Sequence, residues 1–195
     1  YNIIASSNLP FDVSKIGYSL INDDIKIYYT KNNDNELFDL NYVFDLGNYQ
    51  DKYLNLAFAY IEYLGTDKYT PEQIKEEFYK LGCSFNMSAG SERSYITISG
   101  LSKNMGKAIE LFEHIVKSAQ PNKEALDNMI SDVLKARENA KQNQNSIFSY
   151  LVTYGIYGKN SPVFAIQLSE SELKAITPEQ LISKIKEWMQ FKHFV

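Results

Sequence analysis

The sequence lacks most of the residues and motifs that build reactive sites. Among 195 residues it contains one cysteine and two histidines. A single cysteine excludes an intrachain disulfide bond and leaves the redox compartment open. We expect Cys83 to be a buried and unreactive thiol, because free cysteine usually behaves as a small hydrophobic residue. A Gly-x-Ser-x-Gly elbow, a glycine-rich phosphate loop and a cysteine pair are all missing, so none of the usual enzyme signatures is present.

Two further absences concern membranes and nucleic acids. No stretch approaches the roughly 18 apolar residues that a membrane-spanning helix requires, and the N-terminus lacks the pattern of a secretory signal. The 24 acidic and 20 basic residues give a net charge of -4, without a basic block. We therefore expect neither membrane insertion nor binding to nucleic acid.

The chain does contain enough apolar residues for a substantial core, with 44% hydrophobic and 14% aromatic content. Its length suits one domain, and we interpret residues 1–195 as a single domain. The sequence has no initiator methionine and stops on Phe194 and Val195, which resemble the start of a strand. We expect the chain to be a piece of a longer protein.

Alternating side chains predict a mainly antiparallel sheet with one polar face. Two short strands are expected within residues 18–29, on either side of a turn at Asn22, Asp23 and Asp24. The next strand alternates between an apolar face, with Phe38, Leu40, Tyr42, Phe44 and Leu46, and a polar one, with Asp39, Asn41, Val43 and Asp45. Residues 84–89 and 93–100 repeat this period of two. The pattern indicates a sheet covered by helices on one side and open to water on the other.

Helical patterns fill the rest of the chain. Residues 52–64 are apolar almost all round, which predicts a buried helix between the sheet and an outer helical layer. Thr70 and Gln73 form a capping box for a helix that Gly82 ends. Further helices are expected at about 104–119, 122–142 and 146–157, and two more begin at Ser169 and at Thr177. The predicted class is therefore α+β.

The buried helix carries the most informative pattern. Residues 53–66 read YLNLAFAYIEYLGT, followed by a Thr-Pro-Glu-Gln helix start, a Leu-Gly pair, two strands and another helix. This order resembles the zinc-site region of the insulinase/pitrilysin metallopeptidases, whose helix reads roughly G-L-A-H-x-x-E-H-x-x-x-x-G-T. Aligning Gly65 and Thr66 with that motif puts Leu56 and Tyr60 at the two histidines and Ala59 at the catalytic glutamate. Leucine and alanine cannot bind zinc or move a proton, so we predict that this domain has no catalytic, cofactor or metal site.

The remaining candidate ligands do not replace the lost motif. His114 falls on the polar side of its helix, and we expect it to be a solvated surface residue. His193 lies so near the end of the chain that its role stays open. The family's third ligand is a glutamate on a helix corresponding broadly to 122–142. The carboxylates there, Glu124, Asp132 and Glu138, are interpreted as solvated helix charges.

Tyrosines and the polar sheet face allow more than one interpretation. The 15 tyrosines gather at 28–29, 49–69 and 150–157 and could line a peptide-binding surface, but we expect them to pack at the edges of the core. The face with Asp39, Asn41, Asp45 and Asn86 is either the wall of a substrate chamber or a wet surface. The sequence does not separate these two possibilities.

The resemblance implies a metallopeptidase (LuxS/MPP-like) domain, an antiparallel mixed sheet with helices packed on one face. Family members resemble a clamshell of two halves, each with two such domains and with zinc in only one half. This chain looks like the first domain of the inactive half, which encloses a peptide substrate and pairs with a zinc-bearing catalytic half on the same chain or on another subunit. No substrate-binding residue is carried over from the family. The resemblance favours an extracytoplasmic, periplasmic location.

Two alternatives stay open beside this leading hypothesis. The chain could be a stand-alone module that binds peptides or proteins and kept the fold without the chemistry. It could also be an enzyme with an unrecognised site, sensitive to mutation of Cys83, His114 or a carboxylate. Weighing these by fold resemblance is analogy, because no site residue decides between them.

Overall fold

The computed structural model describes residues 17–20 and 25–195, and the predicted turn at 22–24 lies outside them. Six strands form one sheet in the order β1-β2-β6-β3-β5-β4. The strands are β1 (Gly17–Leu20), β2 (Ile25–Tyr29), β3 (Leu37–Phe44), β4 (Cys83–Ala89), β5 (Ser94–Leu101) and β6 (His193–Phe194). Neighbouring strands run antiparallel except β2 and β6, which are parallel. The predicted sheet, mainly antiparallel and mixed, is confirmed.

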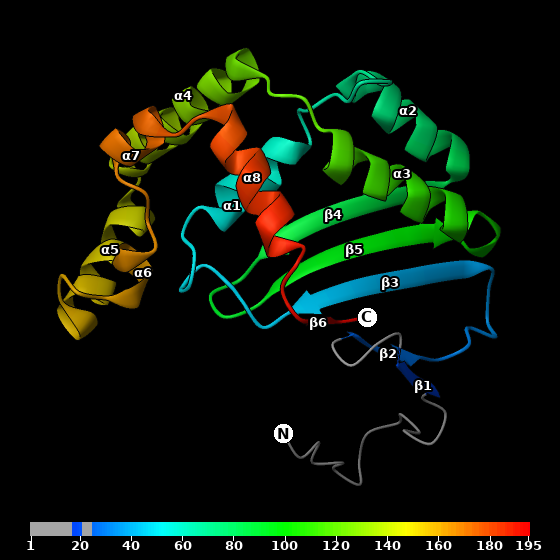
Figure 1. Cartoon of the computed structure of the whole chain (residues 1–195). Helices are drawn as coiled ribbons and strands as arrows, with labels where there is room; N and C mark the ends of the chain where they lie inside the picture. Colours follow the sequence, from blue (N-terminus) through cyan, green and yellow to red (C-terminus); the bar gives the residue numbers. More distant parts are fainter. Residues whose placement is uncertain (1–16, 21–24) are drawn as a thin grey trace, which may run out of the picture.

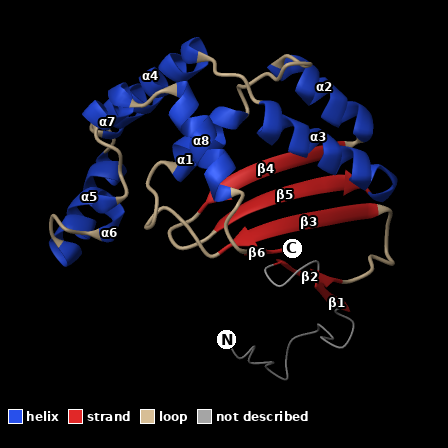
Figure 2. Cartoon of the chain, viewed as in Figure 1, coloured by secondary structure: helices blue, strands red, loops and turns tan. Residues whose placement is uncertain are grey.

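The helices lie on one side of this sheet, with α5 and α6 set apart from it, as Figure 2 shows. They are α1 (Leu54–Ile61), α2 (Pro71–Leu81), α3 (Met105–Ser118), α4 (Lys123–Ala140), α5 (Gln144–Tyr157), α6 (Pro162–Ala165), α7 (Glu170–Ala175) and α8 (Pro178–Trp188). Helices α1, α2 and α3 pack on β4 and β5, while α8 packs against α1 and α3. Helix α4 contacts α1 from outside and α7 packs on α4 (Figure 1). The α+β class with helices on one face is confirmed.

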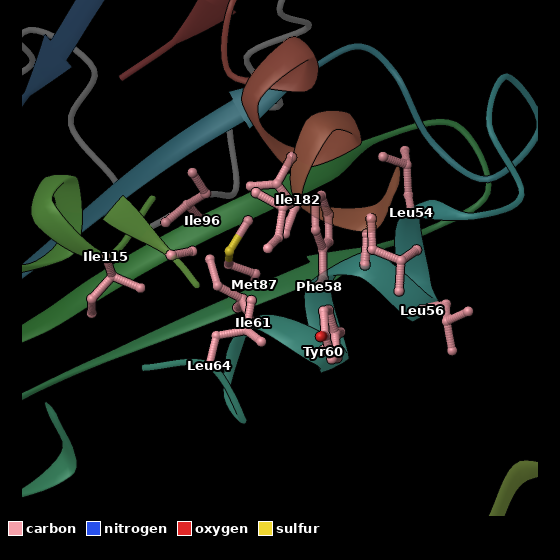
Figure 3. Close-up of a cluster of buried hydrophobic side chains, with 14 of the residues drawn as sticks. Leu54, Leu56, Phe58, Tyr60, Ile61, Leu64, Met87, Ile96, Ile115 and Ile182 are labelled. Atoms are coloured by element: carbon pink, nitrogen blue, oxygen red, sulfur yellow. The ribbon is translucent and has the colours of Figure 1, made fainter. Parts of the chain in front are cut away.

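The alternation in the sequence places the core between the sheet and these helices. Phe44, Ile96 and Ile98 are fully buried on the helical side, whereas Asp39 and Asn41 are exposed on the other. Trp188 at the end of α8 inserts beside Phe44, with ring centroids 3.9 Å apart. Figure 3 shows how side chains from α1, β4, β5, α3 and α8 meet in this layer. Burial of such apolar area is the dominant favourable term in folding.

The local start and stop signals hold where the sequence predicts them. Thr70 and Gln73 form the expected capping box of α2, and Gly82 ends this helix with φ at 59°, a conformation that glycine adopts without steric cost. The second Thr-Pro-Glu-Gln, at residues 177–180, caps α8 in the same way. Helix α6 is an addition that the sequence analysis does not predict, since four residues are too few to show a helical period.

No helix in the described part of the chain has the length and hydrophobicity needed to cross a membrane.

Candidate functional site

The helix that resembles the zinc-site helix is α1, and the two residues aligned with the histidines serve packing. Leu56 is buried, with 8% of its side chain exposed, and Tyr60 is fully buried. Ala59, at the position of the glutamate, is exposed. In Figure 3, Leu56 and Tyr60 belong to a cluster of buried hydrophobic side chains that includes Phe58 and Ile61. The helix therefore sits in the place expected for a motif helix but presents core residues.

Tyr60 has a defined structural role through its hydroxyl group. The hydroxyl donates a hydrogen bond to the backbone carbonyl of Asn122 and accepts one from the backbone N–H of the same residue, both at 2.8 Å. Asn122 is the N-cap of α4, and its side chain accepts from the N–H of Ala125. Burial raises the pKa of Tyr60 above its ordinary value. A neutral phenol with both hydrogen bonds used links α1 to the start of α4 and is not available as a metal ligand.

The donors that a zinc ion needs are not assembled at this helix. Within residues 17–20 and 25–195, no three His, Cys, Asp or Glu side chains gather in a way that could hold a metal ion. On α4, Glu124, Asp132 and Glu138 are exposed helix charges, as predicted. The residues at the motif positions therefore do not fit a zinc ion. That the domain has no catalytic, cofactor or metal site stays a prediction for measurement.

His114 is not the solvated residue that the sequence analysis predicts. Only 21% of its side chain is exposed. Its Nε2 lies 3.1 Å from Thr66 Oγ1 and 3.3 Å from Asp67 Oδ1, and its ring meets Tyr69 edge-on. The prediction is wrong because the loop after α1 folds over this side of α3.

This histidine cluster does not form a catalytic relay. A serine-protease-type relay places the nucleophile at one ring nitrogen and the orienting carboxylate at the other. Here Thr66 and Asp67 both approach Nε2. Cys83, the other named residue of an unrecognised enzyme site, is a buried free thiol, as predicted. These arrangements give no support to an enzyme with an unrecognised site.

His193 lies in β6, which pairs with β2 and β3. Its ring packs against Phe44, with centroids 4.7 Å apart, and against Tyr42 at 5.8 Å. Its Nδ1 lies 2.9 Å from the carbonyl oxygen of Phe191. His193, whose role the sequence leaves open, therefore packs at the end of the sheet.

The face of the sheet opposite the helices is a polar surface with ordered side chains. Asn41 Nδ2 donates to Asp39 Oδ1 at 2.6 Å, and Thr97 Oγ1 on the neighbouring strand donates to Asn41 Oδ1 at 2.7 Å. Farther along, Arg93 pairs with Asp45 at 2.8 Å. Strand β4 forms the edge of the described sheet beside this face. A face with exposed amide, hydroxyl and carboxylate groups next to an open strand edge can hold an extended peptide.

The tyrosines divide between the two expected environments. Tyr42, Tyr53 and Tyr69 pack partly buried against the core, which confirms the expectation of core edges for them. For others the expectation is wrong, because about half or more of the side chain is exposed: Tyr28, Tyr29, Tyr49 and Tyr63, and in α5 Tyr150, Tyr154 and Tyr157. A cleft of about 920 Å³ separates α5 from the body of the molecule.

Comparison with known proteins agrees with the sequence resemblance. The family model of the insulinase peptidases, peptidase family M16, matches residues 59–162, more than half of the chain. A peptidase M16 inactive domain from Pseudomonas fluorescens superposes with a TM-score of 0.71 and 21% identity, covering 86% of this chain and 42% of that one. Curated protein sequences give no match.

Two larger proteases share the fold at lower identity. The periplasmic protease PqqL from Escherichia coli has a TM-score of 0.77 and 10% identity, over 93% of this chain and 21% of that one. The ferredoxin protease FusC, in complex with Arabidopsis ferredoxin, has a TM-score of 0.77 and 12% identity, over 92% and 20%. The chain thus spans less than half of each structure, and at these identities the likeness concerns the fold. By its sequence match and its fold, the chain belongs to the insulinase family of peptidases, family M16.

Proposed function

We propose that this chain is a non-catalytic domain of an insulinase-type zinc protease. It acts as part of a structural half that encloses the peptide substrate and pairs with a zinc-bearing catalytic half. One observation carries the proposal: in a chain of this family, Leu56 and Tyr60, which our alignment on Gly65 and Thr66 puts at the two histidine positions, are both built into the core. Because the Tyr60 hydroxyl is committed to Asn122, no small movement turns it into a zinc ligand.

The fold neighbours support the rest of the proposal. The Pseudomonas fluorescens structure is an inactive domain, and the larger neighbours are proteases of which this chain spans about a fifth. A partner domain with the catalytic residues, on the same polypeptide or on a separate subunit, is consistent with that share. The periplasmic location of PqqL supports the same compartment for this protein. The polar sheet face with Asn41 and Thr97 is our candidate for the chamber wall.

The zinc content of the purified chain tests the proposal directly. After dialysis against trace zinc, elemental analysis is expected to find far less than one zinc per chain, and a fluorogenic peptide should not be cleaved. Tyr60→Phe serves as a matched variant, because it removes only the hydroxyl and should leave the zinc content unchanged. One tightly held zinc per chain, lowered by Tyr60→Phe, would overturn the assignment of α1 as a motif helix without its ligands.

A second candidate is a stand-alone binding module, which the exposed apolar surface of α5 favours. This candidate requires the isolated chain to bind a peptide or protein without a catalytic partner. Titration of a mixed peptide library onto the immobilised chain separates the two. Affinity in the micromolar range or tighter for the chain alone supports the module, whereas binding only in the presence of a zinc-bearing half supports the enclosing domain.

A further inference from the structure

Helix α5 carries no charged side chain, and none of its residues is buried. The eight large apolar residues of this helix have between 42% and 68% of their surface exposed: Ile147, Phe148, Tyr150, Leu151, Val152, Tyr154, Ile156 and Tyr157. Exposed helices normally carry charged residues on their solvent face, and a helix that is apolar all round is normally packed on most sides. The described part of the chain supplies no such packing for α5.

The size of this surface argues for a stable interface. Eight large side chains at about half exposure leave on the order of 800 Å² of apolar area in water. Soluble monomers rarely expose more than a few hundred Å² of contiguous apolar surface. One side of a standard protein–protein interface buries about 800 Å². The exposed area of α5 therefore matches what one partner contributes to a specific complex.

Helix α5 and helix α6 form a unit that we call the arm, residues 144–165. The rings of Tyr150 and Phe164 stack at 4.6 Å and join the two helices. Figure 1 shows the arm to one side of the molecule, away from the sheet. The cleft of about 920 Å³ lies along its inner side, with apolar walls that include Ile147, Leu151 and Val163. Its charged lining residues are Arg137, which donates a hydrogen bond to the carbonyl of Leu168, and Lys141, which pairs with Glu138.

We propose that the arm and its cleft are the docking surface for another peptidase-fold domain of the same protease. This inference rests on the proposed function, which requires such a domain. Exposure on all sides means that the arm inserts into a groove of the partner, and the lack of charge on α5 means that the groove is apolar where it meets this helix. The element entering the cleft is an apolar helix, since the cleft walls are apolar and its two cationic side chains already have partners within the chain.

A second copy of this chain is the alternative occupant of the surface. In a symmetric pair, the arm of one copy would enter the cleft of the other. The fold neighbours extend well beyond this chain, which spans 20% to 42% of them, so a further domain is present in those molecules. We therefore commit to a different domain as the occupant.

Site-directed photo-crosslinking in the cells that naturally make the protein tests this surface. A photoreactive phenylalanine analogue replaces Phe148 in the arm or, as a control, Tyr79 on α2, which is 84% exposed. Mass spectrometry then identifies the crosslinked peptides. Crosslinks from position 148 to another insulinase-family domain, and none from position 79, support the inference. Crosslinks from position 148 to a second copy of this chain, or to an unrelated protein, overturn it.

The same experiment separates failure of the inference from failure of the proposed function. If an H-x-x-E-H domain crosslinks from position 79 and not from 148, the docking surface is wrong while the pairing stands. If no complex with an H-x-x-E-H domain is found and position 148 crosslinks to no other insulinase-family domain, the proposed function itself fails and the inference with it.

Charge-introducing variants add a quantitative readout. Phe148→Glu combined with Leu151→Glu is expected to lower the crosslink yield from a probe at Ile156 at least tenfold. Tyr79→Glu, an equally large change at another exposed aromatic residue, should leave that yield unchanged. Circular dichroism and the urea midpoint of the 195-residue chain should be unaltered in both, because the substituted residues are exposed. An unchanged yield in the double variant overturns the inference.

Discussion

Helices α1 and α5 are alike in composition and opposite in burial. Both are uncharged and apolar nearly all round. Six of the eight residues of α1 are buried, under the sheet, α8 and α4, whereas no residue of α5 is buried. Composition thus shows that a helix must be covered and leaves open what covers it. For α1 the cover comes from the same chain; for α5 we propose that it comes from a partner domain.

The largest expected contrast is between two aromatic residues, one in each region. Trp188 is 1% exposed, packs on Phe44 and Phe58, and donates its indole N–H to Ser94 Oγ at 2.9 Å. Trp188→Ala should lower the free energy of unfolding by about 3–5 kcal/mol. Phe148 is 68% exposed, and Phe148→Ala should change the free energy of unfolding by less than about 0.5 kcal/mol. Urea unfolding followed by circular dichroism measures both.

A milder core variant protects this comparison if Trp188→Ala does not fold. Trp188→Phe keeps much of the ring packing and removes the hydrogen bond to Ser94, so its loss should lie between those of the two alanine variants. Equal losses for Trp188→Phe and Phe148→Ala would mean that the arm is as well packed as the core.

The second contrast concerns a buried and an exposed hydroxyl group. Tyr60→Phe leaves the N–H and carbonyl of Asn122 without their partner in a buried setting, and should destabilise the chain by about 1–3 kcal/mol. Tyr154→Phe removes an exposed hydroxyl from the arm and should have almost no effect. Thermal unfolding of the two variants side by side gives the difference. A neutral Tyr60→Phe would show that the link between α1 and α4 contributes nothing to stability.

The sequence predicts those features of the molecule that depend on residues close together along the chain. The alternation of β3 and the capping box of Thr70 and Gln73 are local patterns, and both are confirmed. The resemblance to the insulinase family also comes from local patterns, and the family match confirms it, while the alignment of Leu56 and Tyr60 with the histidines stays a prediction. These features follow from a few neighbouring residues and their preferred backbone geometry.

The failures involve contacts between segments far apart in the chain. His114 is covered by a loop 48 residues earlier, and the hydroxyl of Tyr60 binds a residue 62 positions later. Neither contact has a periodic signature. The sequence does not predict the exposure of α5 for a related reason. An apolar helical period indicates that a helix is packed against something, without showing whether its own chain supplies the packing.

The third contrast compares helix caps in the two regions. The side chain of Thr70 caps α2, and that of Asn143 caps α5 by accepting from the N–H of Ser146. Thr70→Ala should lower the free energy of global unfolding by about 1 kcal/mol, because α2 packs on the sheet. Asn143→Ala should mainly increase local fraying of α5, because the arm has few buried contacts that couple it to the core. Hydrogen exchange by mass spectrometry distinguishes the two, and a global effect of Asn143→Ala would contradict the independence of the arm.

The smallest effect is a pH dependence at the segment that returns from the arm to the body. The Lys52 ammonium, 2.6 Å from Glu172, together with the N–H and hydroxyl of Ser169, lowers the pKa of Glu172 from 4.5 to about 2. A carboxyl group whose pKa is lower in the folded state stabilises the fold above pH 4.5, and this contribution is lost as the pH falls towards 2. Glu172→Gln should therefore be less stable than the natural chain at pH 7, by an amount that shrinks between pH 4.5 and 2. Glu124→Gln, at an exposed carboxylate, controls for the loss of one negative charge. If the stability difference between the natural chain and Glu172→Gln stays constant over this pH range, the ion pair of Lys52 and Glu172 does not hold α7 to the loop before α1. Because both side chains are partly exposed, added salt should also reduce the stability difference between the natural chain and Glu172→Gln. This salt dependence separates the ion pair from the buried contacts that hold α1.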